Sequence, residues 1–300
     1  MVRIDKKIFE RGLKVADSQM FREDKIWSRY SNDKVDIGET LARVIRTLSK
    51  ALPLTRKIRA LSIGSSNEPQ FRILETACNG GLYLLDIEQG ALDVVRERIR
   101  RQRTGHVFTI RADYDKCFLF CKHCMDFLRD HLHNQRMNLV TLHHSLYYCN
   151  EHQWQPLYRN LYRNLTAPVA AMHAVLMARA TREPYTTSWL YEHFVGKFFG
   201  QHNTQDLQKF RLEIEHDRVF NKAQILAKKS RVQFFVNDFE QFMAVVWMVL
   251  LYPNVHRYSL KQREEITEFI YKHFWIRKRP LWQIQDHLVV YRGVAFKGLI

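Results

Sequence analysis

Apolar runs that read as strands alternate with segments of helical spacing along the first 180 residues. The run 58–63 carries only one charged residue and stops at Gly64. After a short polar turn, Phe71, Leu74 and Cys78 recur at the spacing of one helix face. A buried strand, a tight glycine turn and a helix predict the opening βα unit of a parallel sheet, with Gly64 at the mouth of a ligand crevice.

The same alternation continues to residue 177. We expect further strands at 82–88, 106–110, 137–142 and 169–177, separated by helices at 91–99, 114–133 and 150–165, the last ended by Pro168. Alternating strands and helices predict the α/β class, with a Rossmann-like, doubly wound and mostly parallel sheet.

The segments on either side of this core are expected to be mostly helical. Residues 1–55 predict an N-terminal helical cover, and residues 56–178 form the α/β core. Residues 179–300 predict a helical insertion and the last strands of the sheet. The expected elements there are helices at 188–199, 204–228, 238–252 and 260–274, and strands at 232–236 and 287–291.

Charge adds a candidate class of partner to this picture. The chain has a hydrophobic share of 46% and a formal net charge of +16, with basic residues clustered around Arg100, Lys228 and Lys278. Such a field attracts phosphorylated metabolites, nucleic acid or acidic proteins. The alternative is a solvated basic surface with no cognate partner.

Export and membrane insertion are not expected. The first twelve residues are charged, unlike a signal peptide. The longest apolar run, 242–252, is too short for a bilayer and reads as a buried helix. Five cysteines, an odd number, fit a reducing compartment. We therefore expect a cytoplasmic protein without a membrane partner.

Acidic residues follow the second and third predicted strands. Asp86 comes about twenty residues after Gly64, and Asp113 follows the third strand. A carboxylate at the end of the second strand suits a ribose diol, because it accepts from both hydroxyls. The alternative for Asp86 is an acid favoured by the dipole of the following helix.

Together with the stretch NLVTLHHSLYY at 138–148, these residues resemble a class I S-adenosylmethionine-dependent methyltransferase over roughly residues 58–177. The resemblance implies S-adenosylmethionine as cofactor and a binding set of Gly64, Ser65, Ser66, Glu68, Asp86, Ile87, Asp113 and His143. Ser66 and Glu68 occupy the places of the later family glycines. Serine still lets a backbone approach the ligand, and Glu68 is a candidate acceptor for the ammonium group of the cofactor.

Histidine and tyrosine side chains follow the fourth strand, beside the methyl group that the resemblance implies. An oxygen or protonated nitrogen acceptor must lose a proton, and histidine suits that task near neutral pH. His143 lies nearest the strand end and is the first candidate base, with His144 and Tyr147 as further catalytic candidates. The alternative is that these side chains only pack the cofactor.

Cys117, Cys121 and Cys124 form a competing motif. Their spacing is that of a four-iron cluster in radical S-adenosylmethionine enzymes. The same residues continue into Leu128 and Leu132 at helical spacing, which favours three buried small side chains on one helix face and no metal. The function classes are thus a methyltransferase, a radical enzyme, and a catalytically silent protein of methyltransferase-like fold.

Large aromatic residues mark the candidate acceptor site. Trp189 and Phe194 lie in the predicted helix 188–199, and Tyr30 in the N-terminal cover. Aromatic faces tolerate a sulfonium charge and exclude water. We expect these three residues to bind a small-molecule acceptor, anionic in view of the basic charge, with nucleic acid as a second candidate.

Overall fold

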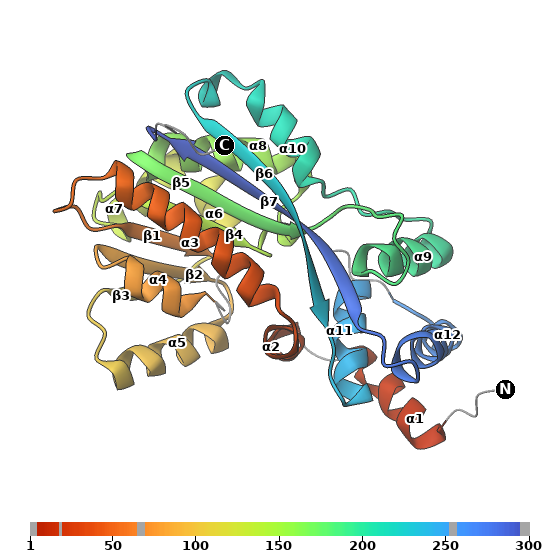
Figure 1. The fold of residues 1–300 in the computed structure, drawn as a ribbon. Helices are drawn as coiled ribbons and strands as arrows, with labels where there is room; N and C mark the ends of the chain where they lie inside the picture. The colour runs from red at the N-terminus through yellow and green to blue at the C-terminus, as the bar shows by residue number, and fades with distance from the viewer. Residues whose placement is uncertain (1–4, 18–19, 65–69, 252–256, 295–300) are drawn as a thin grey trace. The chain divides into compact units, whose positions relative to one another are not determined.

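Seven strands form one sheet in the computed structural model, which describes residues 5–17, 20–64, 70–251 and 257–294 (Figure 1). Their order is β3-β2-β1-β4-β5-β7-β6. The strands are β1 (Arg59–Ile63), β2 (Gly81–Asp86), β3 (Val107–Arg111), β4 (Met137–His143), β5 (Thr166–Met177), β6 (Gln224–Phe234) and β7 (Leu281–Arg292).

The first five strands pair in parallel. β1 pairs with β2 and β4, β2 with β3, and β4 with β5. The chain builds the sheet outward from β1 in one direction and then returns to add β4 on its other side, so a topological switch point lies between β1 and β4. The α/β, Rossmann-like, mostly parallel sheet predicted from the sequence is confirmed.

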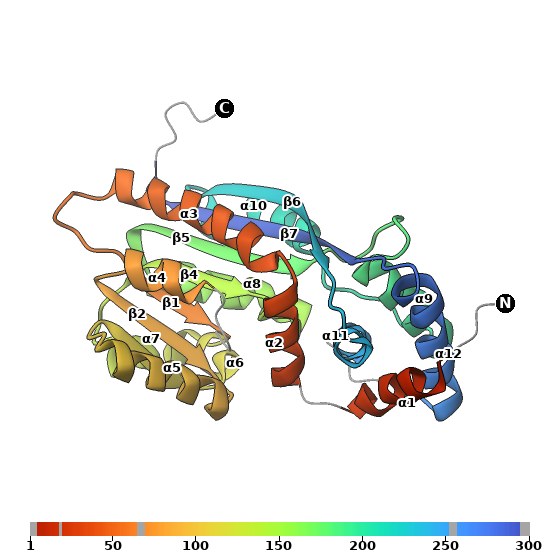
Figure 2. The same cartoon turned by 60° about the horizontal axis from the view of Figure 1, so that its bottom comes forward.

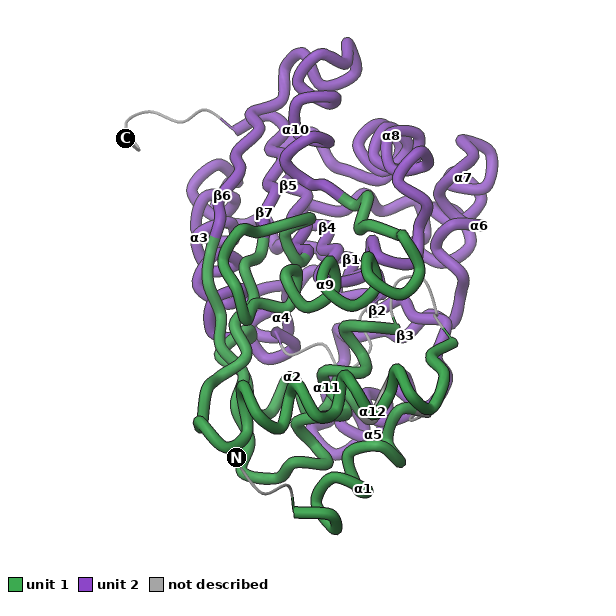
Figure 3. The backbone as a smooth tube through the Cα atoms, turned by 90° about the vertical axis from the view of Figure 1, so that its right-hand side faces the viewer, with its two compact units in different colours: residues 1–34, 177–205, 230–285 green, residues 35–176, 206–229, 286–300 purple. Residues whose placement is uncertain are grey.

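The chain divides into two compact units (Figure 3). Unit 1 comprises residues 1–34, 177–205 and 230–285, and unit 2 comprises residues 35–176, 206–229 and 286–300. This grouping differs from the three consecutive segments expected from the sequence, because each unit collects stretches that are far apart along the chain.

Unit 2 is a layered α/β structure in which helices cover both faces of the parallel strands. One face packs on α3 (Asp33–Ala51), α4 (Phe71–Ala77) and α5 (Gln89–Gln102), and α3 lies along the sheet (Figure 2). The other face packs on α6 (Tyr114–Phe118), α7 (Cys121–Asp130), α8 (Glu151–Asn160), the π-helical turn Leu161–Leu165 and α10 (Leu207–Glu215).

Alternation along the strands explains the two cores. Ala60 and Leu82 point to the α3 side, whereas Leu61 and Tyr83 point to the α8 side. Burial on both faces is what turns these strands into near-continuous apolar runs in the sequence.

Unit 1 is mainly helical. Its helices are α1 (Lys6–Lys14), α2 (Met20–Tyr30), α9 (Thr187–Phe199), α11 (Phe239–Leu251) and α12 (Leu260–Ile270), with the π-helical turn Tyr271–Trp275. The apolar α11 is the centre, since α1, α2 and α9 all contact it. Trp247 on α11 is fully buried and donates from its indole Nε1 to the Gly12 carbonyl oxygen at 3.3 Å. The described residues of 5–34 therefore pack within unit 1.

Several expected elements differ from the structure, among them the strands expected at 232–236 and 287–291, which are the longer β6 and β7. The helix expected at 114–133 is two helices, because Phe120 is extended and separates α6 from α7. The helix expected at 204–228 ends with α10, and β6 begins at Gln224. Pro168 lies inside β5 and is exposed, beside a register shift at Met137 and Leu139. A proline is tolerated there because the irregular pairing needs no donor from it.

Candidate active site

The carboxyl end of β1 is held against the loop that follows β4. Gly64 has a φ of +64° and donates its backbone N–H to the Leu85 carbonyl oxygen at 2.9 Å. A Cβ at Gly64 would lie 2.5 Å from the Cβ of Ser145. Glycine is therefore required both by the left-handed backbone and by the close approach of the two segments.

The carboxyl end of β2 presents a buried carboxylate. The Asp86 side chain is 5% exposed, and its Oδ1 accepts from the Glu88 backbone N–H at 2.8 Å. The Asp86 carbonyl oxygen accepts from the Ala112 N–H at 3.1 Å, which brings the ends of β2 and β3 together. The neighbouring Ile87 side chain is largely exposed.

Asp113 has a local structural role at the end of β3. Its carboxylate caps α6 by accepting from the Asp115 N–H at 3.2 Å, and it forms an ion pair of 3.3 Å with Lys116. The next residue, Tyr114, donates its hydroxyl to the Ser145 carbonyl oxygen at 2.8 Å. Burial raises the pKa of Tyr114 above its ordinary value, so the hydroxyl stays a donor that ties α6 to the loop after β4.

The expected cofactor contacts of Ser65, Ser66 and Glu68 lie outside the described residues. Gly64, Asp86, Asp113 and His143 all follow or end neighbouring strands of the parallel sheet. The structure thus brings the described members of the predicted set to one edge of the sheet, on both sides of the switch point, where ligands of such sheets bind.

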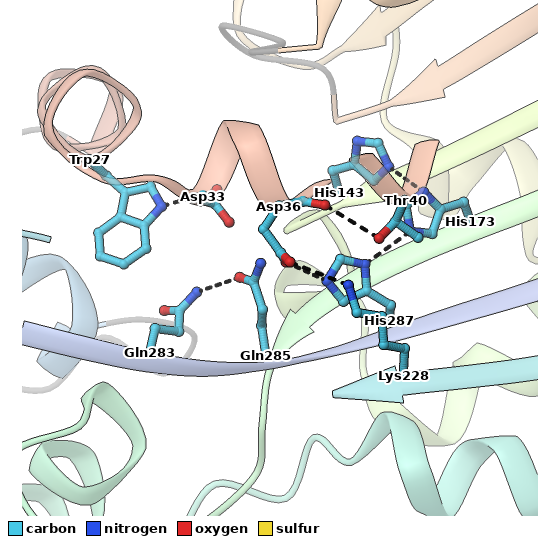
Figure 4. A network of polar contacts seen from close by, with 10 residues as sticks. All are labelled: Trp27, Asp33, Asp36, Thr40, His143, His173, Lys228, Gln283, Gln285 and His287. Carbon is cyan, nitrogen blue, oxygen red and sulfur yellow. Dashed lines mark hydrogen bonds and ion pairs between the residues drawn. The ribbon is translucent and has the colours of Figure 1, made fainter. Parts of the chain in front are cut away.

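His143 is the first member of a chain of hydrogen bonds across three strands (Figure 4). Its Nε2 lies 3.1 Å from Nδ1 of His173 on β5. The Nε2 of His173 lies 3.3 Å from Nδ1 of His287 on β7, and the Nε2 of His287 lies 2.8 Å from Oδ2 of Asp36 on α3. Lys228 on β6 approaches the other carboxylate oxygen with its Nζ at 3.5 Å.

Sheet geometry explains why these side chains meet. His173 is the register partner of Thr141, and Thr141 and His143 lie two residues apart on the same face of β4. Thr141 donates from its Oγ1 to the Ser62 hydroxyl at 3.0 Å, so the polar row continues onto β1. His173 and His287 are buried, whereas His143 is half-buried.

Burial sets the protonation state at the centre of this row. The pKa of His173 is lowered well below 6.5, first by burial, then by the neighbouring His143 and His287, and least by Lys228, with Asp36 opposing the shift. The central ring is therefore uncharged at neutral pH.

His144 and Tyr147 point elsewhere. His144 has a left-handed backbone, with φ of 55°, and its Nδ1 lies 3.3 Å from the Tyr147 hydroxyl. Their rings stack with centroids 5.9 Å apart. The hydrogen bond and the stacked rings join His144 to Tyr147, whereas His143 bonds to His173.

Sequence reasoning missed Asp36, His173 and His287. The sequence analysis gave no role to His173 or His287, and both belong to the hydrogen-bonded chain that begins at His143. The signal in the sequence was a histidine inside an otherwise apolar strand, since a buried polar group needs a partner.

The cysteine motif does not form the single buried helix face that the spacing predicts. Cys117 is at the end of α6 and half-buried, Cys121 begins α7 and is exposed, and Cys124 is buried. Burial is the main cause that raises the pKa of Cys117 to about 11 and of Cys124 to about 12, which disfavours their thiolates. In the described part of the chain, no group of three or more His, Cys, Asp or Glu side chains is arranged to hold a metal ion.

The three candidate acceptor residues belong to unit 1. Phe194 is buried in its core. Trp189 is half-buried and stacks on His193 with ring centroids 4.6 Å apart. Tyr30 is half-buried beside the guanidinium of Arg29, 5.3 Å from its ring centroid.

None of the helices in the described residues combines the length and apolar character needed to span a bilayer.

Comparison with known proteins gives weak structural similarities. No protein-family model matches the chain, and no curated protein sequence matches it. Among solved structures, a candidate methyltransferase from Bacillus halodurans is 12% identical with a TM-score of 0.49, covering 84% of this chain and 99% of its own. A candidate sarcosine dimethylglycine methyltransferase from Galdieria sulphuraria is 10% identical with a TM-score of 0.49, covering 86% of each chain.

A phosphoethanolamine N-methyltransferase of Haemonchus contortus, solved with S-adenosyl-L-methionine, is 12% identical with a TM-score of 0.44. The alignment covers 84% of this chain and 52% of that one. The fold class of the present chain rests on its own strand order and parallel pairing.

Proposed function

We infer that this chain is an S-adenosylmethionine-dependent methyltransferase that acts on a nitrogen or oxygen atom of a small molecule. The observation that carries this inference is the meeting of Gly64 and the buried Asp86 carboxylate at the carboxyl edge of the parallel strands, beside the switch point. A close backbone approach and a carboxylate are the two features that a nucleoside ligand needs at this edge.

The described residues fit such a ligand. Gly64 leaves no side chain between the β1 turn and the β4 loop, and Asp86 offers a carboxylate for the two ribose hydroxyls. Asp113 is assigned to the adenine amine, and Ile87, exposed beside Asp86, to the nucleoside. Ser65, Ser66 and Glu68 complete the assigned set from the sequence.

The bound cofactor would supply an electrophilic methyl group on a sulfonium. Gly64, Asp86 and Asp113 would hold this cofactor, whose methyl group would bond to the lone pair of the acceptor atom while the electron pair of the broken bond stayed on sulfur. The protein lowers the barrier mainly by positioning the two reactants. The proton of the acceptor is transferred to His143. His144 and Tyr147, the further catalytic candidates, lie in the segment that follows β4.

The nucleoside assignment is tested on Asp86. Asp86→Ala should weaken the binding of S-adenosylhomocysteine by about 2–3 kcal/mol, because two hydrogen bonds to a charged group are lost. Isothermal titration calorimetry measures the affinity. Asp86→Asn, which keeps an acceptor oxygen, should lose less.

Asp93→Ala is the matched control. Asp93 is an exposed carboxylate on α5 whose ion pair to Arg96 measures 3.0 Å, so its removal should leave the affinity unchanged. Equal affinities for the wild type and a folded Asp86→Ala variant would refute the role of Asp86. A wild-type protein that binds neither cofactor nor product would refute the function as a whole.

An anionic acceptor is the finer proposal, supported by the net charge of +16. Protein incubated with methyl-labelled cofactor and a small-molecule extract should yield a labelled product that an anion-exchange column retains.

Tyr30, Trp189 and Phe194 are assigned to acceptor binding. Trp189→Ala should lower this labelling without changing cofactor affinity, and label in the unbound fraction or in RNA would exclude the anionic small molecule.

A further inference from the structure

The half-buried His143 is the end of a hydrogen-bonded row whose other end is a carboxylate (Figure 4). We propose that Asp36, acting through His287 and His173, holds His143 in the tautomer that carries its proton on Nε2 and its lone pair on Nδ1. Asp36, His287 and His173 are then positioning residues, and His143 is the base. The use of that base in methyl transfer rests on the proposed function.

When the three rings are uncharged, the direction of every hydrogen bond follows from the carboxylate. An ionised carboxylate only accepts, so Nε2 of His287, 2.8 Å from Asp36, must carry the proton. In an uncharged ring the other nitrogen then accepts, so His287 Nδ1 receives the proton of His173 Nε2 across 3.3 Å.

The same reasoning continues to the end of the row. Nδ1 of His173 is left as an acceptor, and it receives the proton of His143 Nε2 across 3.1 Å. His143 Nδ1 is thereby left with the lone pair. A single carboxylate at one end thus sets the tautomers of three rings.

Two features keep the row in this state. Lys228 Nζ, 3.5 Å from Asp36, favours the ionised carboxylate that can only accept. Complete burial of His173 and the lowered pKa of its ring disfavour a charge at the centre of the row. The row therefore orients and polarises His143 while His173, its central ring, stays uncharged.

The consequence at the site is a preset base. Nδ1 of His143 is itself buried, so its use as a base requires the ring or the residues over it to move when an acceptor binds. The bond from the proton to the acceptor atom then breaks and a new bond to His143 Nδ1 forms. The resulting imidazolium keeps its other proton on Nε2, donated to His173, and the Asp36 carboxylate stabilises the positive charge through the row.

Asp36→Asn should reverse the whole row. Lys228 can only donate, so it should hold the amide oxygen and turn the amide NH₂ toward His287 Nε2. His287 must then accept at Nε2 and donate from Nδ1, and each following hydrogen bond reverses. Lys228→Met removes the charge that favours the ionised carboxylate, but at pH 8 the carboxylate should stay ionised without it, so the hydrogen bonds should keep their wild-type directions.

Nitrogen-15 NMR of protein labelled at histidine reads the tautomers directly. At pH 8 the signals of His143, His173 and His287, each assigned from its own His→Gln variant, should show protons on Nε2 in the wild type and on Nδ1 in Asp36→Asn. The kcat for methyl transfer should fall about 10²-fold in Asp36→Asn with S-adenosylhomocysteine affinity unchanged.

A wild-type spectrum with the His143 proton on Nδ1 would overturn the proposal, whether or not Asp36→Asn folds. So would a folded Asp36→Asn protein with wild-type tautomers. If the tautomers are as expected but no cofactor binds, the methyltransferase function fails and the role of Asp36 in orienting His143 stands.

Discussion

Single residues decide how closely the segments of the site approach one another. Gly64 and Gly200 share the same left-handed φ of +64°, but a Cβ at Gly64 would lie 2.5 Å from Ser145 whereas nothing lies within 4 Å at Gly200. Gly64→Ala and Gly200→Ala should each lower the free energy of unfolding by about 1 kcal/mol, because alanine is strained in the left-handed backbone conformation. Gly64→Ala should lose about 1–3 kcal/mol more to the clash.

Urea unfolding of the two variants and the wild type measures this difference. The comparison isolates the contact with Ser145, because the conformational cost is common to both glycines. Equal losses in the two variants would show that the β1 turn moves away from Ser145 without cost.

At the same scale, the sequence located the residues that end the strands but not their partners. Gly64, Asp86 and His143 were found because a strand end is a local signal. His173 and His287 were not, since their meeting depends on which strands become neighbours and on register. Asp36 reaches the row from a helix, which periodicity alone does not place on a particular strand.

At the scale of elements, the buried parallel strands were the easiest to predict and the exposed ones the hardest. β1, β2 and β4 are apolar on both faces, so their sequences stand out. β6 ends the sheet, and only two of its eleven residues are buried. The run Lys228-Lys229-Ser230-Arg231 reads as a charged helix when taken alone. Lysine and arginine on an edge strand discourage pairing with other chains, which accounts for part of the basic charge.

The ends of helices in both units are easier to predict than the exposed strands, because capping residues mark them in the sequence. Asn150 accepts from the His152 N–H and begins α8 as predicted, and Gly200 ends α9 in a left-handed conformation. The break at Phe120 has no such signal, because neither glycine nor proline marks it.

At the scale of the whole molecule, stability should depend on pH through His173. Its pKa in the folded protein lies well below the 6.5 of the unfolded chain, so the unfolded chain binds the proton first as pH falls. Folding stability contributed by the uncharged ring is present above pH 6.5 and is lost below it. Between pH 7 and pH 5 this loss should be at most about 2 kcal/mol, the value for a ring that stays uncharged in the folded protein.

His173→Gln should remove that component. Urea unfolding should show that the variant is less stable than the wild type at pH 7. Between pH 7 and pH 5 it should lose less unfolding free energy than the wild type, by at most about 2 kcal/mol. His152→Gln, which changes an exposed histidine on α8, is the control and should keep the wild-type pH dependence. A His173→Gln protein with the wild-type dependence would mean that another buried group governs acid sensitivity.

The position of β7 in the sheet has a consequence for synthesis on the ribosome. β7 lies between β5 and β6 although it is translated after both, and its His287 must reach Asp36, made 251 positions earlier. Until β7 emerges, the nascent chain has an unpaired edge on β5, the kind of edge that invites aggregation and chaperone capture. A translation product that stops before β7 also lacks the link from Asp36 to His143. The base that we propose, His143, would thus be oriented by Asp36 only in chains translated through β7, and prematurely terminated copies should lack that orientation.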